Sequence, residues 1–321
     1  EYGGHGGDFR HEMVVIDQQA KHGVEGFAAS LHNTVILPYL VRHGTEEQKK
    51  KYLPKLVSGE LVSAIAMTEP GVGSDLQSVT TTALKDGNGY RINGAKTYIS
   101  NGQTADFIIV VAKTDPNERA KGISLMLLET EGAEGFQRGK KLDKIGLDAS
   151  DTSELFFDDV FVPAENVLGG EEGKGFYQLM GELPQERLII AMGAMTGIEK
   201  ALETTLDFVK NRKAFGQTIW DFQNTQFVMA DLKARATAAK IFVNDCIAKH
   251  LKRELDVPTA CMAKYWVTEL QGEVVDKCLQ FHGGAGFIND YPIARMYRDS
   301  RITRIFGGSN EVMKMVIARS M

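Results

Sequence analysis

The chain has 321 residues, of which 43% are hydrophobic, 25% charged and 8% aromatic, and this balance excludes a disordered or fibrous protein. Its net charge of -5 and pI of about 5.9 exclude the basic surface that nucleic-acid binding requires. No apolar run approaches the roughly 20 residues that span a bilayer, so we expect no nucleic-acid partner and no stable membrane insertion.

The first 62 residues carry helical patterns. One pattern runs from Glu12 to His22, and another runs from Glu46 to Val57, where Thr45 is placed to cap the first turn. We therefore expect an N-terminal helical domain over residues 1–62.

The pattern changes in the middle of the chain, where short apolar or alternating runs are broken by glycine, asparagine and aspartate. The sequence Asp86-Gly87-Asn88-Gly89 is typical of a tight β-hairpin turn. These features predict a middle antiparallel β domain, a small barrel or sandwich, over residues 63–172.

Toward the C-terminus, apolar residues recur at helical spacing and the connections between helical stretches are short. We expect a C-terminal helical bundle over residues 173–321. Its helices are predicted over residues 184–212, 224–255, 258–282, 290–303 and 310–319.

Residue spacing argues against several kinds of site. Cys246, Cys261 and Cys278 have no C-x-x-C spacing and lie in helical stretches among apolar residues, which favours buried thiols in a reducing compartment. The seven histidines have no metal-ligand spacing, so we expect no metal. The glycine pairs within residues 71–73 and 284–286 lack the third glycine of a dinucleotide-binding loop.

Two segments carry a resemblance to a known family. Residues 66–78 read AMTEPGVGSDLQS and residues 280–299 read QFHGGAGFINDYPIARMYRD; both resemble the signature segments of the acyl-CoA dehydrogenase family. The order of helices, strands and helical bundle is also that of the family, so the resemblance covers essentially the whole chain. It implies an α+β fold with N-terminal helices, a middle antiparallel β-barrel domain and a C-terminal four-helix-type bundle. Because the start, EYGGHGG, lies inside the family pattern, we expect the N-terminal helices to be truncated.

The resemblance implies an activity and partners. The expected activity is FAD-dependent α,β-dehydrogenation of acyl-CoA thioesters to trans-2-enoyl-CoA in fatty-acid β-oxidation, with electrons passed to an electron-transferring flavoprotein. The expected assembly is a homotetramer, a dimer of dimers, with FAD bound across subunit interfaces. No targeting segment is visible, and the bacterial cytoplasm and the mitochondrial matrix both fit.

A set of FAD-binding residues follows from the same resemblance. The glycine-rich turn after Thr68 exposes backbone N–H groups and small hydroxyls that suit a flat heteroaromatic ring, and Tyr98 of KTYISNG would lie against that ring. Arg212 suits the pyrophosphate, because a guanidinium pairs with two phosphate oxygens at once. The residues carried over are Met67, Thr68, Tyr98, Ser100, Arg212, Gln223, Gln280, Gly284, Ser309 and Glu311.

The catalytic carboxylate of the family is missing from its usual place. Most members carry it just before the small-residue loop near the C-terminus, but here that loop reads IFGGSNE and the position is Gly307. The long-chain and isovaleryl branches carry the carboxylate in a helix segment ending Glu-Arg-Leu, and this chain reads QERL with Glu186 at that position. We therefore expect Glu186 to remove the α-proton, while the Gly307 N–H binds the thioester oxygen. Glu182, four residues earlier on the same predicted helix face, is the rival base.

The substrate class follows from the helix motif. Its L-P-Q-E-R-L sequence is close to that of the long-chain branch, which favours medium-to-long straight chains, with branched short-chain (isovaleryl-type) thioesters as the second choice. An acyl-CoA oxidase and a catalytically silent flavin- or CoA-binding scaffold are the remaining alternatives. The residues that the resemblance assigns to the substrate are Ser74, Tyr177, Arg187, Gly307 and Gly308.

Overall fold

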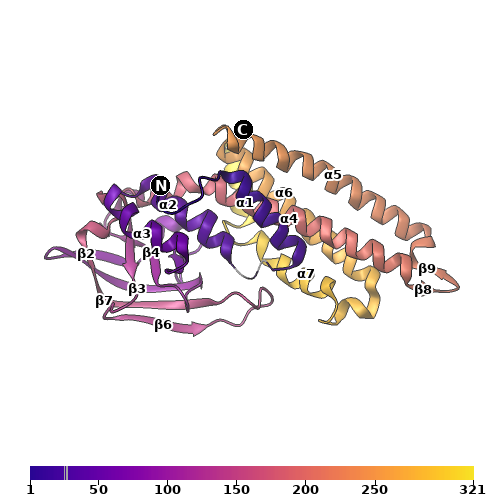
Figure 1. The fold of residues 1–321 in the computed structure, drawn as a ribbon, viewed down its shortest axis with the longest axis horizontal. Helices are drawn as coiled ribbons and strands as arrows, with labels where there is room; N and C mark the ends of the chain where they lie inside the picture. The colour runs from indigo at the N-terminus through magenta and orange to yellow at the C-terminus, as the bar shows by residue number, and fades with distance from the viewer. Residues whose placement is uncertain (25, 27) are drawn as a thin grey trace. The chain divides into compact units, whose positions relative to one another are not determined.

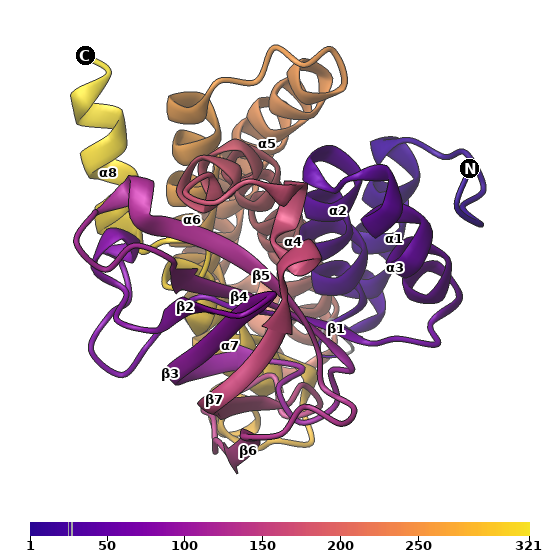
Figure 2. The same cartoon turned by 90° about the vertical axis from the view of Figure 1, so that its left-hand side faces the viewer.

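The computed structural model describes residues 1–24, 26 and 28–321, and the chain forms two compact units. Their elements are labelled in Figures 1 and 2. Within the described residues, no helix is both long and apolar enough to cross a bilayer. Unit 1 comprises Glu1–Asp8, Gly26–Lys144 and Asp148–Leu183, and unit 2 comprises Phe9–Glu25, Ile145–Leu147 and Pro184–Met321.

Unit 1 is built on a seven-stranded sheet in the order β1-β4-β2-β3-β7-β6, with β5 paired to β4. Strands β3, β7 and β6 lie side by side in Figure 1. Most pairs are antiparallel, but β1 and β2 each run parallel to β4. The strands are β1 (Ser63–Ala66), β2 (Thr82–Asp86), β3 (Gly89–Ser100), β4 (Phe107–Lys113), β5 (Ile123–Glu129), β6 (Phe136–Lys141) and β7 (Thr152–Pro163).

The centre of this sheet is buried on both faces. Residues 107–112 of β4 and 123–128 of β5 are all buried, as continuous apolar runs predict. Because successive strand residues point to opposite faces, Ile108 joins one core and Ile109 joins another that includes Tyr39 of α2 (Leu37–His43). The sheet therefore provides a rigid support for the turns at its ends.

Helices α2 and α3 (Glu46–Ser58) contribute to the second core, and a π-helical stretch, η2 (Leu31–Ile36), leads into α2. The start of α3 is the predicted one. Thr45 Oγ1 accepts a hydrogen bond from the Gln48 N–H at 3.2 Å, and Gln48 Oε1 accepts one from the Thr45 N–H at 3.0 Å. This reciprocal pair is a capping box.

A bulge in β3 depends on glycine. The β3–β7 register shifts between Ile92 and Gly94, and Gly94 has a φ of +151°, which residues with a side chain rarely adopt. A Cβ at Gly94 would also lie 2.8 Å from Thr81 Cα. Both the backbone conformation and the close approach therefore require glycine.

Unit 2 is helical. It contains α4 (Gly175–Asn211) from Pro184 onward, α5 (Gln223–Leu251), α6 (Val257–His282), α7 (Pro292–Ser300) and α8 (Asn310–Arg319). The long helices run side by side in Figure 1, and α6 packs against α5, α7 and α8. Their buried residues recur at helical spacing, which is the pattern of a bundle.

The first helix, α1 (Phe9–His22), belongs to unit 2. Thr196 Oγ1 of α4 donates to Asp17 Oδ1 at 3.0 Å, and the rings of Phe9 and His250 lie 4.5 Å apart in an edge-to-face arrangement. These contacts join residues far apart in the sequence, so local patterns do not reveal them.

The predicted architecture of N-terminal helices, a middle β domain and a C-terminal helical bundle is confirmed. Residues 86–89 form the turn of an antiparallel hairpin between β2 and β3, as predicted. Helix α4 begins at Gly175, earlier than the predicted start at residue 184. Proline usually disfavours a helix interior, so the sequence pattern placed the start at Pro184, which in fact lies inside the helix.

We expect Gly94→Ala to lower the free energy of unfolding by about 2 kcal/mol more than Gly87→Ala does. A Cβ at Gly87, whose φ is +55°, would meet nothing within 4 Å, whereas Gly94 combines a φ of +151° with the overlap at Thr81. Thermal unfolding of both variants measures the difference. Equal losses would show that neither the conformation of Gly94 nor its overlap with Thr81 is important.

Candidate active site

The two segments expected to bind the flavin lie side by side in unit 1. The Thr97 N–H donates to the Thr68 carbonyl oxygen at 2.9 Å, and Thr68 Oγ1 donates to the Thr97 carbonyl oxygen at 2.5 Å. These bonds bring Met67 and Thr68 next to the end of β3 that carries Tyr98 and Ser100.

Tyr98 is held facing outward in a strained conformation. Its φ is +60°, which is uncommon for a residue other than glycine, and the register with β7 shifts between Lys96 and Ile99. Its side chain is 69% exposed. Bulges and strained residues gather at functional sites, where they aim a side chain at a ligand.

A buried ion pair lies among these segments. Lys96 Nζ is 2.9 Å from Glu69 Oε1 and donates to the Met67 carbonyl oxygen at 3.0 Å; the two side chains are 0% and 2% exposed. Glu69 also accepts hydrogen bonds from the N–H groups of Thr80 and Thr81 at 2.7 and 2.9 Å. The pair therefore ties residues 67–69 to β3.

Both members of this pair are charged at neutral pH. Burial raises the pKa of Glu69, but the Lys96 ammonium and the Thr80 and Thr81 donors outweigh it and lower that pKa to about 2. Burial lowers the pKa of Lys96 to about 8, against the opposing effect of the Glu69 charge. Removing either partner would leave an uncompensated buried charge.

The rival base Glu182 is engaged by two side chains of α2. Its carboxylate is 2% exposed, accepts a hydrogen bond from Arg42 and lies 2.9 Å from His43 Nε2. Both oxygens of the Glu182 carboxylate therefore contact side chains of α2.

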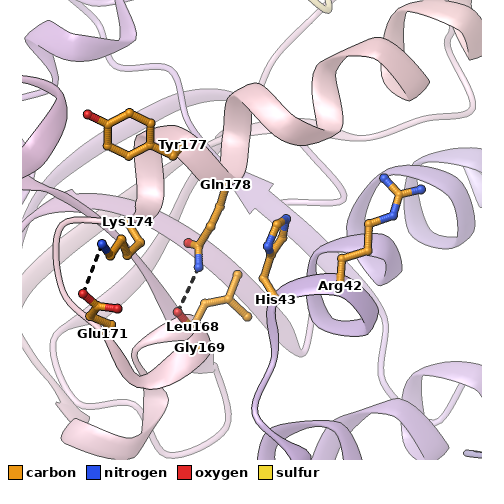
Figure 3. Close-up of a pocket in the computed structure, with 8 residues that line it drawn as sticks. All are labelled: Arg42, His43, Leu168, Gly169, Glu171, Lys174, Tyr177 and Gln178. Atoms are coloured by element: carbon orange, nitrogen blue, oxygen red, sulfur yellow. Dashed lines mark hydrogen bonds and ion pairs between the residues drawn. The ribbon is translucent and has the colours of Figure 1, made fainter. Parts of the chain in front are cut away.

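A shallow groove of about 430 Å³ passes Arg42 and His43 in unit 1. Tyr177, which is 54% exposed, lies at one side of it and points away from His43 (Figure 3). Lys174 at the rim pairs with Glu171 at 3.1 Å. The lining residues are Arg42, His43, Leu168, Gly169, Glu171, Lys174, Tyr177 and Gln178.

In unit 2, the loop at Gly307 meets α4 at Ile190, one helical turn after Glu186. Glu186 and Arg187 of α4 are 8% and 4% exposed. Gly307 has a φ of +64°, and a Cβ built on it would overlap Ile190 Cδ1. Ile190 follows Glu186 by four residues, so the two side chains share a helix face. Of the two possible positions, 186 and 307, the helix position carries the carboxylate.

The loop that contains Gly307 is fastened by a buried lysine. Lys264 of α6 is 0% exposed and donates to the Gly308 carbonyl oxygen and to Asn310 Oδ1, both at 2.8 Å. Ser309 Oγ accepts a hydrogen bond from the Val312 N–H at 3.4 Å and so caps α8. The loop is therefore held at both ends.

Arg187 and Lys264 form an electropositive region behind this loop. Burial and the nearby Arg187 lower the pKa of Lys264 to about 8. Arg187 Nη1 donates to Cys261 Sγ at 3.2 Å, and within the described part of the chain its Nε has no hydrogen-bond partner. Such buried positive charge favours negative charge that develops nearby.

Arg212 and Gln223 lie at the opposite end of α4. Arg212 follows the helix directly, at the base of a hairpin formed by β8 (Lys213–Ala214) and β9 (Gln217–Thr218), and Gln223 is the first residue of α5. Phe215, in the turn of this hairpin, has a φ of +51° and is 95% exposed. This end of the bundle thus displays both cationic and aromatic groups.

Gln280 and Gly284 lie at the end of α6, close to the same end of α4. His282 between them stacks on Phe208 with 4.2 Å between ring centroids, and burial lowers its pKa, as fits a structural histidine. A Cβ at Gly284 would meet nothing within 4 Å, so the backbone there is open to a ligand.

The length of α4 separates Arg212 and its neighbours at the end of the bundle from Glu186. From Glu186 to Asn211 the helix rises by about 38 Å, at about 1.5 Å per residue. Arg212 and Glu186 therefore cannot line the same small-molecule site within one chain. Of the remaining predicted residues, Ser74 is exposed beyond the Glu69–Val72 bridge, and Glu311 lies in the first turn of α8.

Sequence reasoning missed Lys96, Lys264 and Ile190, and also the partners of Glu182. Lys264 was detectable in principle, because a lysine within the apolar run CMAKYWV falls on the buried side of an amphipathic helix. Lys96 had no such signal, since alternation in β3 is interrupted by the bulge. The role of Ile190 depends on a loop more than 100 residues away.

Three family descriptions match successive parts of the chain. They are "Acyl-CoA dehydrogenase, N-terminal domain" over residues 1–60, "Acyl-CoA dehydrogenase, middle domain" over residues 64–160 and "Acyl-CoA dehydrogenase, C-terminal domain" over residues 173–321.

Individual relatives match along the full chain. The long-chain specific acyl-CoA dehydrogenase, mitochondrial, of Sus scrofa is 48% identical over 322 residues, which cover 100% of this chain and 74% of that protein. Isovaleryl-CoA dehydrogenase, mitochondrial, of Pongo abelii is 40% identical over 324 residues, covering 100% of this chain and 76% of that protein. The crystal structure of an acyl-CoA dehydrogenase from Geobacillus kaustophilus matches with a TM-score of 0.97 and 47% identity, covering 99% of this chain and 84% of that one.

We expect Lys96→Met to lower the free energy of unfolding by about 3–5 kcal/mol, because it leaves the Glu69 carboxylate buried without its counter-charge. Lys85→Met is the matched control: Lys85 pairs with Glu172 at 2.8 Å but is 73% exposed, so its loss costs about 1 kcal/mol or less. Thermal unfolding at pH 7 compares the two variants.

The Lys96–Glu69 pair also predicts how the stability of the fold depends on pH. The folded-state pKa of Glu69, about 2, is below its ordinary value of 4.5; its stabilisation is therefore present above pH 4.5 and is lost as the pH falls toward 2. The difference in melting temperature between wild type and Lys96→Met should shrink over that window. A difference that stays constant from pH 6 to about pH 2.5 would contradict the ion pair.

Proposed function

The chain belongs to the acyl-CoA dehydrogenase family, and on that premise we propose that this oxidoreductase converts acyl-CoA thioesters to trans-2-enoyl-CoA with Glu186 as the base. The observation that carries the assignment is the meeting of Gly307 and Ile190 on the α4 face that bears Glu186. Position 307 holds no proton acceptor.

Each residue has a distinct task in the proposed reaction. Glu186 removes the α-proton, and the Gly307 N–H donates to the thioester oxygen as negative charge develops there. Gly308 lets the acyl group pass close to the backbone, since glycine has no side chain. Ser74, Tyr177 and Arg187 would contact the rest of the substrate.

The cofactor we propose is FAD, which when bound accepts a hydride from the β-carbon. The residues present fit this group, because Tyr98 offers an exposed aromatic face beside the backbone of Met67 and Thr68. The Ser100 hydroxyl would donate to the ring system. Ser309 and Glu311 would contact the ribityl chain.

We propose that each FAD site is completed by a second copy of the chain within a homotetramer. The support is the length of α4, since about 38 Å of helix separates Glu186 from Arg212. Arg212 would pair with the pyrophosphate of an FAD whose ring lies in the partner. Gln223, Gln280 and Gly284 would contact the same cofactor.

The proposed substrates are medium-to-long straight-chain acyl-CoA thioesters, and the proposed electron acceptor is an electron-transferring flavoprotein. The support for chain length is the helix-borne Glu186 together with the relative described as long-chain specific. Branched short-chain substrates are the second candidate, because the isovaleryl relative also matches along the full chain. Three free, buried cysteines fit a reducing compartment such as the mitochondrial matrix or the bacterial cytoplasm.

We expect Glu186→Gln to slow the anaerobic bleaching of bound flavin by acyl-CoA by about 10²–10⁴-fold, because the isosteric amide cannot accept the α-proton. Glu182→Gln is the matched control, and it should retain bleaching within about tenfold of wild type, since Glu182 contacts Arg42 and His43 and has no part in the proposed proton removal. Stopped-flow absorbance on FAD-saturated protein measures both rates.

The opposite pattern, with loss in Glu182→Gln and retention in Glu186→Gln, would overturn the assignment of the base. FAD binding without bleaching in the wild type would instead identify a catalytically silent scaffold. Flavin content of each variant, measured after denaturation, shows that lost cofactor is not the cause.

A substrate panel should show faster flavin reduction by medium- and long-chain thioesters than by isovaleryl-CoA. The measurement is the initial anaerobic rate at equal substrate concentrations. Hydrogen peroxide produced stoichiometrically during aerobic turnover would contradict the flavoprotein acceptor and identify an acyl-CoA oxidase.

A further inference from the structure

We propose that Ile190 determines where the catalytic carboxylate can stand on this fold. Its side chain fills the space that a side chain at position 307 would need, so the carboxylate has to come from α4. This inference rests on the proposed role of Glu186 as the base.

Ile190 is the obstacle to a side chain at position 307. The nearest atoms to a Cβ built on Gly307 are Ile190 Cδ1, which it would overlap, and Ile190 Cγ1 at 3.9 Å. Apart from the flanking residues of the loop, no other heavy atom of the described chain lies within 4 Å of that position. A single methyl group therefore closes the space.

Helix geometry directs Ile190 toward Glu186. Side chains on an α-helix lean toward its N-terminus, so a residue covers the turn before its own Cα. Ile190 follows Glu186 by four residues and hence leans over the turn that carries the carboxylate. A carboxylate reaching in from position 307 would compete for the same volume.

Ile190 cannot rotate aside as a whole. A β-branched residue in a helix has one strongly preferred χ1 rotamer, so moving the entire side chain is costly. Rotation about χ2 displaces Cδ1 alone, and the half-buried position of Ile190 limits the space for that rotation. The obstruction therefore comes from one methyl group on an otherwise fixed branch.

The loop cannot retreat either. Lys264 holds the Gly308 carbonyl oxygen at 2.8 Å, and a Cβ on Gly308 would lie 2.8 Å from Met313 Cε, so the loop is enclosed on that side. Moving it away from α4 would break a buried hydrogen bond to a charged group. With the loop held in place, a side chain at position 307 would meet Cδ1 of Ile190 in addition to the strain of a positive φ.

Ile190→Val gives a sharp test, because it deletes Cδ1, the overlapping atom, and keeps the β-branch. Gly307→Ala should lower the melting temperature in the wild-type background and lower it by about 2–4 °C less in the Ile190→Val background. Ile189→Val is the control: it deletes a methyl from the neighbouring buried residue and should give no relief. Equal losses in all three backgrounds would overturn the proposal.

A second experiment moves the catalytic carboxylate from position 186 to position 307. The double variant Glu186→Gln/Gly307→Glu should bleach flavin at a rate no more than about tenfold above that of Glu186→Gln alone. Adding Ile190→Val to the double variant should raise the bleaching rate by a further 10-fold or more, out of the roughly 10²–10⁴-fold loss caused by Glu186→Gln. Recovery that is complete without Ile190→Val, or absent with it, would overturn the role of Ile190.

The two arms separate this inference from the proposed function. Unfolding of Gly307→Ala and Ile190→Val involves neither substrate nor flavin reduction, so it tests the steric relation whatever the reaction is. Full bleaching by Glu186→Gln alone would remove the proposed base, and relief of Gly307→Ala by Ile190→Val would still establish the steric relation.

Discussion

The period of the α-helix is the constraint on which the site depends. Because α4 repeats every 3.6 residues, Glu186 and Ile190 share a face, and the same face meets the loop at Gly307. The helix then continues without a break to Asn211 and carries Arg212 to the opposite end of the bundle. One element thus positions both the proposed base and, about 38 Å away, the arginine proposed to bind the cofactor pyrophosphate.

Two buried lysines stabilise different parts of the candidate site, Lys96 in unit 1 and Lys264 in unit 2. Lys96 is neutralised by Glu69, and the pair fixes the backbone beside which a flavin ring would lie. Lys264 donates to neutral oxygens, at Gly308 and Asn310, and keeps its positive charge close to Arg187. The Lys96–Glu69 pair holds the backbone conformation of residues 67–69. Lys264, together with Arg187, also supplies positive charge that favours a nearby anion.

Much of the fold could be predicted from the sequence, whereas the contacts around the candidate site could not. The cap at Thr45 and the hairpin at residues 86–89 depend on neighbours within a few residues, so local patterns contain them. The engagement of Glu182 by Arg42 joins residues 140 positions apart, and the burial of Lys96 depends on a bulge; neither is encoded in a local pattern. Helical spacing alone treats Glu182 and Glu186 as equivalent, so the contacts of Glu182 could not be predicted from it.

The exposure of Phe215 matters for a chain that has not yet assembled into the proposed homotetramer. It stands almost fully in water at the tip of a short hairpin, beside the arginine that we assign to a cofactor in a second copy. Exposed apolar rings invite nonspecific association. In the proposed homotetramer, a chain that has not yet assembled would therefore expose this ring to nonspecific contacts, and the yield of active enzyme would depend on chain concentration as well as on folding.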